Sequence, residues 1–305
     1  MMKYRCVHKI LETYDNNEKR LKHKYISICV ALLILALIIF TYLYFSSEKF
    51  IYGVIECDGG YEITTFRSFG ELENGRLEIP AQIDGIPVTS IGESTFEGNE
   101  EIQYVIIPNS IKKIGDFAFK GCENLLQVEI PEGVETIGWY AFKNCKSLKL
   151  VNISDSVISI GLGAFEDCNN LKKITLPFTG DGGEYTNFGY IFGAYSHFSN
   201  SLYVPNNLKQ VTFTGHTVDF CAFYGCSTIE RIVLTDKLTT ICESAFSNCT
   251  SLRSIVIPKN VSRIDAVAFF GCENLIIFCE SLKQPSEWHY AWNLSNHTVI
   301  WGYDN

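Results

Sequence analysis

Phenylalanine marks a repeating pattern of apolar positions along most of the chain. Phe96 and Phe119 are 23 residues apart, and this interval recurs in the later copies except for one gap of 58 residues. An aliphatic residue stands five positions before each phenylalanine, and another stands six positions after it. The seven phenylalanines are Phe96, Phe119, Phe142, Phe165, Phe223, Phe246 and Phe269. The pattern predicts a structure built from 23-residue units.

Each unit ends in a short alternating segment, for example QVEIP at residues 127–131. Alternation with β-branched residues is typical of a strand, and the proline that closes most copies ends its pairing. Such a unit is too short to bury its own apolar positions, so we expect successive units to stack and align them internally. The predicted fold class is therefore a repeat solenoid of 23-residue coils, with short strands, turns and at most one helical turn per coil.

Two positions in each unit are expected to form corners. The residue two positions after each phenylalanine is Gly, Asn or Asp, the types that tolerate a left-handed backbone. These residues are Gly98, Gly121, Asn144, Asp167, Gly225, Asn248 and Gly271. Ile-Gly pairs, such as Ile114-Gly115 and Ile137-Gly138, predict a second corner.

The spacing Leu-x-x-Val-x-Ile-Pro, followed by Val-x-x-Ile-Gly-x-x-Ala-Phe-x-x-Cys, resembles the BspA-like class of leucine-rich repeats. The resemblance covers residues 77–278. It implies a bacterial or protozoan surface protein that is used for adhesion and protein recognition. The lead-in RLEIPAQIDGIPVTSIG and the tail EWHYAWNLSNHTVIWGY are similar to the caps that flank such arrays.

The two ends of the array are expected to be covered, because an uncapped solenoid would expose its inner apolar rows. In the N-terminal cap, residues 46–76, YEITTFRSF alternates like a strand and Asn74-Gly75 is a turn signal, so we expect a hairpin over Leu77 and Ile79. The C-terminal cap, residues 279–305, holds Trp288, Trp292 and Trp301. These indoles form either a hydrophobic lid on the last coil or an exposed surface for stacking on sugar rings.

The 58-residue gap between Phe165 and Phe223 indicates one irregular, enlarged coil whose excess lies at about residues 178–205. The gap equals one period plus 35 residues, or two periods plus 12. The insertion is rich in Gly, Asn and aromatic residues. It is either a loop that carries binding or a structural bulge packed by its own Tyr and Phe side chains.

The N-terminal part predicts a single transmembrane helix. Residues 1–24 are basic and polar, and residues 25–45 are uncharged and apolar, long enough to cross about 30 Å of hydrocarbon at about 1.5 Å per residue. This run is longer than a signal-peptide core, and bulky aromatics follow it, so we expect an uncleaved anchor. Seven Lys or Arg residues precede it. The predicted localisation is therefore a single-pass membrane protein with a cytoplasmic N-terminus and residues 46–305 outside the cell.

The charge of the outer part argues against polyanionic partners. The whole chain has 25 Lys and Arg residues and 34 Asp and Glu residues. Residues 46–305 contain 18 of the basic residues and 31 of the acidic ones, which gives this part a net charge of −13. A protein with this charge is not expected to bind nucleic acid or an anionic lipid surface.

Six cysteines keep phase with the repeat, and we expect them to be buried, reduced and inert. Like residues of neighbouring coils point the same way about 4.8 Å apart, so their thiols do not face one another. They are Cys122, Cys145, Cys168, Cys226, Cys249 and Cys272. Outside this row Cys57, Cys221, Cys242 and Cys279 remain available for pairing, but the sequence predicts no connectivity.

The sequence offers no catalytic site, cofactor site or metal site. It has no P-loop, dinucleotide glycine pattern, GxSxG or HExxH. His216, Asp219 and Cys221 are close in sequence, but this segment is the corner of a repeat, and such proximity does not establish a catalytic relay. We therefore expect a protein that is not an enzyme.

The strand residues that alternate with the inward-pointing Val and Ile positions are expected to form one neutral, partly apolar and flat surface. These candidate site residues are Tyr104, Ile106, Gln127, Glu129, Leu150, Asn152, Lys173, Thr175, Gln210, Thr212, Arg231, Val233, Ser254 and Val256. Such a surface suits a protein partner better than a small molecule, which needs a concave pocket. The leading hypothesis is protein binding in adhesion or recognition. The alternative is carbohydrate or cell-wall glycan binding through the aromatic C-terminal cap or the bulge at 178–205.

Overall fold

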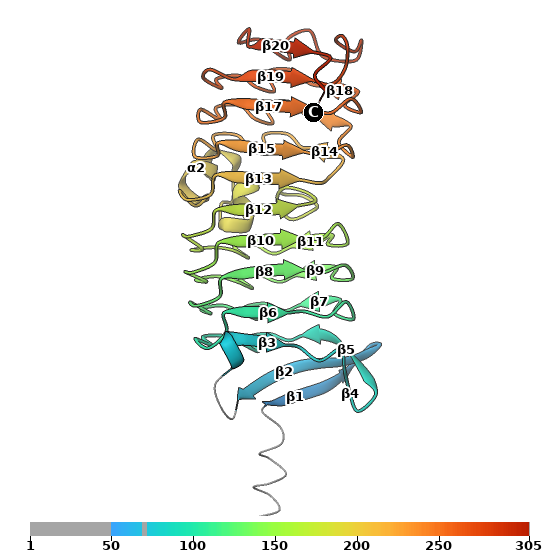
Figure 1. The fold of residues 1–305 in the computed structure, drawn as a ribbon, viewed down its shortest axis with the longest axis vertical. Helices are drawn as coiled ribbons and strands as arrows, with labels where there is room; N and C mark the ends of the chain where they lie inside the picture. The colour runs from blue at the N-terminus through green and yellow to red at the C-terminus, as the bar shows by residue number, and fades with distance from the viewer. Residues whose placement is uncertain (1–49, 69–71, 305) are drawn as a thin grey trace, which may run out of the picture. The chain divides into compact units, whose positions relative to one another are not determined.

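The computed structural model describes residues 50–68 and 72–304. Residues 52–67 and 72–304 form one compact unit, a β-solenoid in which most coils contribute one strand to a main column and one to a second column (Figure 1). Pairing between strands of successive coils is parallel, and Leu150 lies opposite Gln127 on one side and Lys173 on the other. Because each of these partners is one period away, the predicted 23-residue coil is confirmed.

The main column contains the longer strands of each coil. One sheet consists of β3 (Arg76–Glu78), β6 (Tyr104–Ile106), β8 (Gln127–Ile130), β10 (Leu150–Ile153), β12 (Lys173–Leu176), β13 (Gln210–Phe213) and β15 (Arg231–Leu234). A second sheet continues the column with β17 (Ser254–Ile257), β19 (Ile276–Cys279) and β20 (Thr298–Trp301).

The second column contains mostly two-residue strands and is interrupted at the enlarged coil. Its first sheet holds β1 (Phe50–Cys57), β2 (Gly60–Ser68), β5 (Ile86–Ile91), β7 (Lys113–Ile114), β9 (Thr136–Ile137) and β11 (Ser159–Ile160), with β4 (Gln82–Ile83) paired to β5. Its second sheet holds β14 (Thr217–Val218), β16 (Thr240–Ile241) and β18 (Arg263–Ile264).

The repeat phenylalanines are aligned inside the solenoid, as predicted, and stack in two runs, Phe96 to Phe165 and Phe223 to Phe269, on either side of the enlarged coil. All seven are at most 2% exposed. The rings of Phe119 and Phe142 are 5.1 Å apart and parallel within 2°, and those of Phe142 and Phe165 are 5.3 Å apart. Phe66 begins the row next to Phe96 with ring centres 5.2 Å apart. Each ring therefore buries its faces against the coils before and after it, which a single coil could not do.

The in-phase cysteines are buried, as predicted, and they also act as hydrogen-bond donors. Cys122 Sγ donates to the carbonyl of Phe96 (3.2 Å), and Cys145 Sγ donates to the carbonyl of Phe119 (3.3 Å). The interaction recurs at Cys168, Cys249 and Cys272. Burial raises the pKa of Cys122 to about 12. The Cys122 thiol therefore stays protonated and gives the carbonyl of Phe96, which also accepts from the N–H of Asn99, a second hydrogen bond.

The corner two residues after each phenylalanine is confirmed, because all seven residues there have φ between 60° and 73°. The second corner was predicted at the wrong position. The Ile-Gly glycines are needed for close stacking: a Cβ on Gly115 would lie 2.7 Å from the carbonyl carbon of Gly92. The left-handed residue instead lies two positions before the phenylalanine, where Phe117, Tyr140 and Val267 have φ of 56°, 55° and 50°.

The enlarged coil contains short helices: η2 (Phe188–Phe192), η3 (His197–Ser199) and α2 (Asn200–Tyr203). The backbone N–H of Phe165 donates to Ile191, and that of Phe188 donates to Ala222, so the insertion supplies a complete coil between its neighbours. The gap is therefore two periods plus 12 residues. The fully buried Asn200 joins this coil to the next through Nδ2, which donates to the carbonyls of Ala222 (3.2 Å) and Tyr224 (2.9 Å).

The N-terminal hairpin is present, but its predicted position is only partly correct. Strand β2 pairs in parallel with β5 and so covers the edge of the second column. The hairpin reaches the main column through Tyr52, whose hydroxyl donates to the carbonyl of Glu78 (3.1 Å). Burial raises the pKa of Tyr52 to about 12. The turn predicted at Asn74-Gly75 is confirmed by φ values of 53° and 65°.

The C-terminal tryptophans form a lid. Trp288 and Trp292 are 3% and 4% exposed, and their rings are 4.9 Å apart. Trp288 Nε1 donates to the carbonyl of Val261 (3.2 Å), and the ring of Trp292 meets the edge of Phe269. Because two of the three indoles are buried against the last coils, their faces are not available for stacking on a sugar.

The predicted membrane anchor at residues 25–45 and the cytoplasmic segment 1–24 lie outside the described residues. Across the part of the chain that the structure describes, no helix combines the length and apolar character needed to traverse a bilayer.

Candidate functional site

All candidate site residues lie on seven strands of the main column, and none of them is buried. The intervening residues point inward: in β8, Val128 and Ile130 are 1% and 2% exposed while Gln127 and Glu129 are exposed. Alternation along a strand separates the two faces, so the outward residues form a surface that we call the strand face. It consists of the predicted residues on β6, β8, β10, β12, β13, β15 and β17.

Strand pairing brings these residues together in two rows. Lys173 lies opposite Leu150 and Gln210, and Thr175 lies opposite Asn152 and Thr212. This register continues from β12 to β13 although the enlarged coil separates them in sequence. Because pairing at the face is undisturbed, the insertion does not interrupt the surface.

The strand face is longer than the sequence predicted. Ile276 and Phe278 on β19 pair with Thr298 and Ile300 on β20, and the side chains of all four are at least partly exposed. Both strands were missed because IIFC lacks a closing proline and the tail loses the 23-residue interval. The periodic leucine at Leu275, which is 2% exposed, was the available signal for β19.

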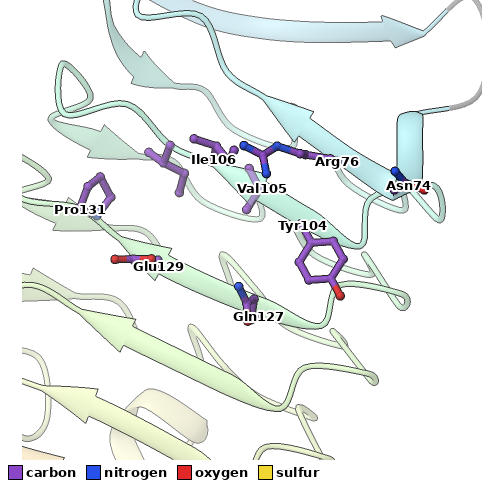
Figure 2. A pocket seen from close by; sticks show the side chains of 9 residues that line it. Asn74, Arg76, Tyr104, Val105, Ile106, Gln127, Glu129 and Pro131 are labelled. Atoms are coloured by element: carbon purple, nitrogen blue, oxygen red, sulfur yellow. The ribbon is translucent and has the colours of Figure 1, made fainter.

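A hollow of about 600 Å³ lies at the N-terminal end of the strand face. Figure 2 shows its lining, with Arg76 from β3, Tyr104 and Ile106 from β6, and Gln127 and Glu129 from β8. Tyr104 and Ile106 are 37% and 38% exposed, so the hollow has both apolar and polar walls. Arg76 is held by an ion pair with Glu78 on the same strand, at 3.0 Å.

A smaller hollow of about 280 Å³ lies near the other end of the face, where the two sheets of the main column meet. Val233, Val256 and Phe278 contribute apolar surface, and the ring of Tyr303 packs against Phe278 with centres 4.8 Å apart. Arg231, Asp236 and Glu280 also line this hollow, so the face has a depression of mixed apolar and polar character near each end.

A third hollow of about 480 Å³ lies on the other side of the coils, beside the interruption of the second column. Asp155 there accepts a hydrogen bond from Thr214 Oγ1 (2.5 Å) and pairs with Lys237. These interactions lower the pKa of Asp155, with Lys237 the larger cause. The charged groups satisfy each other, which makes this cluster a brace between coils.

The closely spaced His216, Asp219 and Cys221 do not have the properties of a nucleophilic site. Burial raises the pKa of both Asp219 and Cys221, which favours the protonated thiol rather than the thiolate. His216 Nδ1 is in hydrogen-bond contact with the carbonyl of Lys237 at 2.9 Å.

Within the described part of the chain, the cysteines outside the repeat row form no disulfide with one another. Unpaired thiols are present at Cys57, Cys221, Cys242 and Cys279. In residues 50–68 and 72–304, no group of three His, Cys, Asp or Glu side chains is arranged to hold a metal ion.

Short parallel strands, internal rows of Phe and Cys and recurrent left-handed corners define a leucine-rich repeat solenoid. The family model described as "BspA type Leucine rich repeat region" matches the chain in six copies, over residues 89–212 and 196–291. The chain belongs to this family. No curated protein matches it.

Solved structures with similar coils come from several bacteria. A leucine-rich cell surface protein from Faecalibacterium prausnitzii is 30% identical, with a TM-score of 0.42, over 77% of this chain and 54% of that one. The present chain thus spans about half the length of that relative. A leucine-rich repeat protein of T. pallidum is 24% identical, with a TM-score of 0.38, over 75% of this chain and 78% of that one. The pneumococcal vaccine antigen PcpA is 18% identical, with a TM-score of 0.34 and 84% of both chains covered.

Proposed function

We propose that this chain is a membrane-anchored, extracytoplasmic BspA-type leucine-rich repeat protein whose strand face binds another protein in adhesion or recognition. The observation that carries the proposal is the strand face itself, an uninterrupted exposed surface on successive strands. Its mixture of apolar and polar groups, with shallow depressions, is the composition of a protein-binding surface. The apolar stretch at residues 25–45 supports the anchor.

The proposal is tested with a face variant and a matched control. Leu150→Asp together with Val233→Asp places two charges on half-buried apolar positions of the face. The control, Ile158→Asp together with Leu282→Asp, makes the same chemical change at positions that are 65% and 87% exposed and lie outside the face.

The full-length wild-type chain and both variants are displayed on cells, and bound proteins are cross-linked and identified by mass spectrometry. We expect a specific set of proteins to be cross-linked by the wild type and the control but not by the face variant. Equal cross-linking by all three would refute the proposal.

Carbonate extraction tests the anchor, because an integral helix keeps the chain in the membrane pellet.

Glycan binding is retained as a second candidate, now confined to the bulge at 178–205. Tyr195 and Phe198 there are 68% and 70% exposed. Phe198 meets Tyr224 at 5.6 Å, and His197 lies beside both of them. Exposed rings of this kind stack on sugars. Loss of a glycan-array signal in a Tyr195→Ala, Phe198→Ala variant would favour this function, and an array without any signal would remove it.

A further inference from the structure

The centre of the strand face carries a concentration of positive charge in a domain that is acidic overall. We use the name basic strip for five exposed residues, which are Lys149, Lys172, Lys173, Lys209 and Arg231. Lys173 and Arg231 belong to the predicted face, whereas the three other lysines directly precede its strands. The sequence-based description of the face as neutral did not include these flanking positions.

Backbone hydrogen bonds hold the strip in register. The N–H of Lys172 donates to the carbonyl of Lys149 (2.9 Å), and the N–H of Lys209 donates to the carbonyl of Lys172 (3.1 Å). The N–H groups of Glu230 and Arg231 both donate to the carbonyl of Lys209 (3.0 Å each), so the acidic Glu230 follows Lys209 in this row and Arg231 ends the strip on the next strand. Neighbouring strands are about 4.8 Å apart, so the strip extends for roughly 14 Å from β10 to β15.

Little within the domain neutralises this charge. Among the described residues, only Lys209 of the strip has an ion-pair partner, Glu230 at 3.4 Å, and both side chains are about half exposed. An exposed pair at this distance is weak. The other basic side chains of the strip project from a surface of Asn, Thr and Gln, such as Asn152 and Thr175. Repulsion among these charges decreases when an anionic partner covers them.

The two hollows on the face show which kind of anion fits. One begins at Tyr104 and Ile106, on the N-terminal side of the strip. The other begins at Arg231 of the strip and has Val256 and Phe278 as its apolar part, with Asp236 and Glu280 at its polar part. A polypeptide can carry carboxylates in its middle and large apolar side chains at both ends. A sulfated or uronic polysaccharide carries the charges but not the apolar groups.

We propose that the strand face binds an extended acidic segment of a partner protein, with apolar residues on both sides of the acidic stretch. This inference rests on the proposed function, because it specifies the partner of the same face. From β6 to β17 is about 29 Å at about 4.8 Å per strand, which an extended peptide covers in about nine residues. Carboxylates of the segment pair with the basic strip, and its apolar side chains enter the two hollows.

The test uses the full-length chain in detergent and a fluorescent peptide of about nine residues, acidic in its middle and with Phe at each end. Fluorescence anisotropy measures its affinity for the wild type and for Lys172→Glu/Lys173→Glu. The control variant, Lys113→Glu/Lys283→Glu, changes the net charge equally at exposed positions outside the face. Circular dichroism verifies that both variants are folded.

We expect the strip variant to lose affinity about tenfold or more, since two attractive contacts become repulsive, and the control to stay within about twofold. We also expect weaker binding for a peptide with Gln in place of the acids and for one with Ser in place of the terminal Phe residues. Equal losses in both variants, or no loss in either, would overturn the inference. So would binding of a sulfated polysaccharide but not of the peptide.

The outcomes also separate this inference from the proposed function. If the cross-linked proteins disappear with Leu150→Asp/Val233→Asp but the strip variant retains them and the peptide does not bind, the face binds protein and the acidic segment is wrong. If neither the proteins nor the peptide bind, both proposals fail.

Discussion

Replacing one ring of the phenylalanine row tests whether the stacked coils hold one another together. Phe142 is fully buried, and parallel rings lie on both sides of it at 5.1 and 5.3 Å. Phe142→Ala removes the buried ring and leaves a cavity, which costs about 3–5 kcal/mol in well-packed cores. Loss of two aromatic contacts places the expected value in the upper part of this range. Because each coil contacts only its neighbours, one substitution weakens two interfaces.

The measurement is urea unfolding of the full-length chain in detergent, followed by circular dichroism, with the free energy taken from the midpoint and slope. Phe270→Ala is the matched control, because Phe270 adjoins the row in sequence but is 49% exposed. We expect the control to lose about 0.5 kcal/mol or less. A loss below about 1 kcal/mol for Phe142→Ala, or equal losses in the two variants, would refute the role of the row.

Three further predictions concern the corners, the thiols and the lid. Gly163→Ala should destabilise the fold more than Gly225→Ala does. Both glycines have positive φ, but only a Cβ at position 163 would collide with another residue, at 2.5 Å from the ring of Tyr140. The measurement is the free energy of unfolding of the two variants. For Cys122, burial raises the pKa from 9.0 to about 12. Its stabilising contribution is therefore complete below pH 9 and decreases by about 1.4 kcal/mol per pH unit as the pH rises towards 12. Urea unfolding between these pH values should show a shallower decrease in Cys122→Ser. Trp288→Phe loses the indole hydrogen bond of 3.2 Å to a buried carbonyl, so we expect a lower unfolding free energy by about 1 kcal/mol in the same assay.

Much of the fold could be predicted because its strongest determinants are periodic. The interval between phenylalanines gave the coil length, and the small residues that follow them gave one corner. The other corner could not be read from residue type, because Phe117 and Val267 occupy a left-handed position that these residues usually avoid. There the backbone bonds between coils fix the conformation and override local preference: the N–H of Val267 donates to the carbonyl of Ala291.

The exposed positions of seven strands could be predicted, but the lysines that precede three of them and the two C-terminal strands could not. Alternation within a strand identifies outward residues, so Lys173 and Gln210 were found. Lys172 and Lys209 precede the strands and become part of the surface only through pairing between coils, which a pattern within one coil does not contain. At the C-terminus, the segment NHTVIW at residues 296–301 departs from the repeat consensus, and only the pairing of β20 with β19 shows that the array continues.

The enlarged coil shows how this architecture can acquire new features. Strands β12 and β13 pair in register although the intervening segment is longer than elsewhere, and only the second column is interrupted. Extra length is thus absorbed on one flank while the strand face keeps its spacing. Such a chain can gain or exchange insertions on that flank without altering the strand face, so the two sides are free to diverge independently.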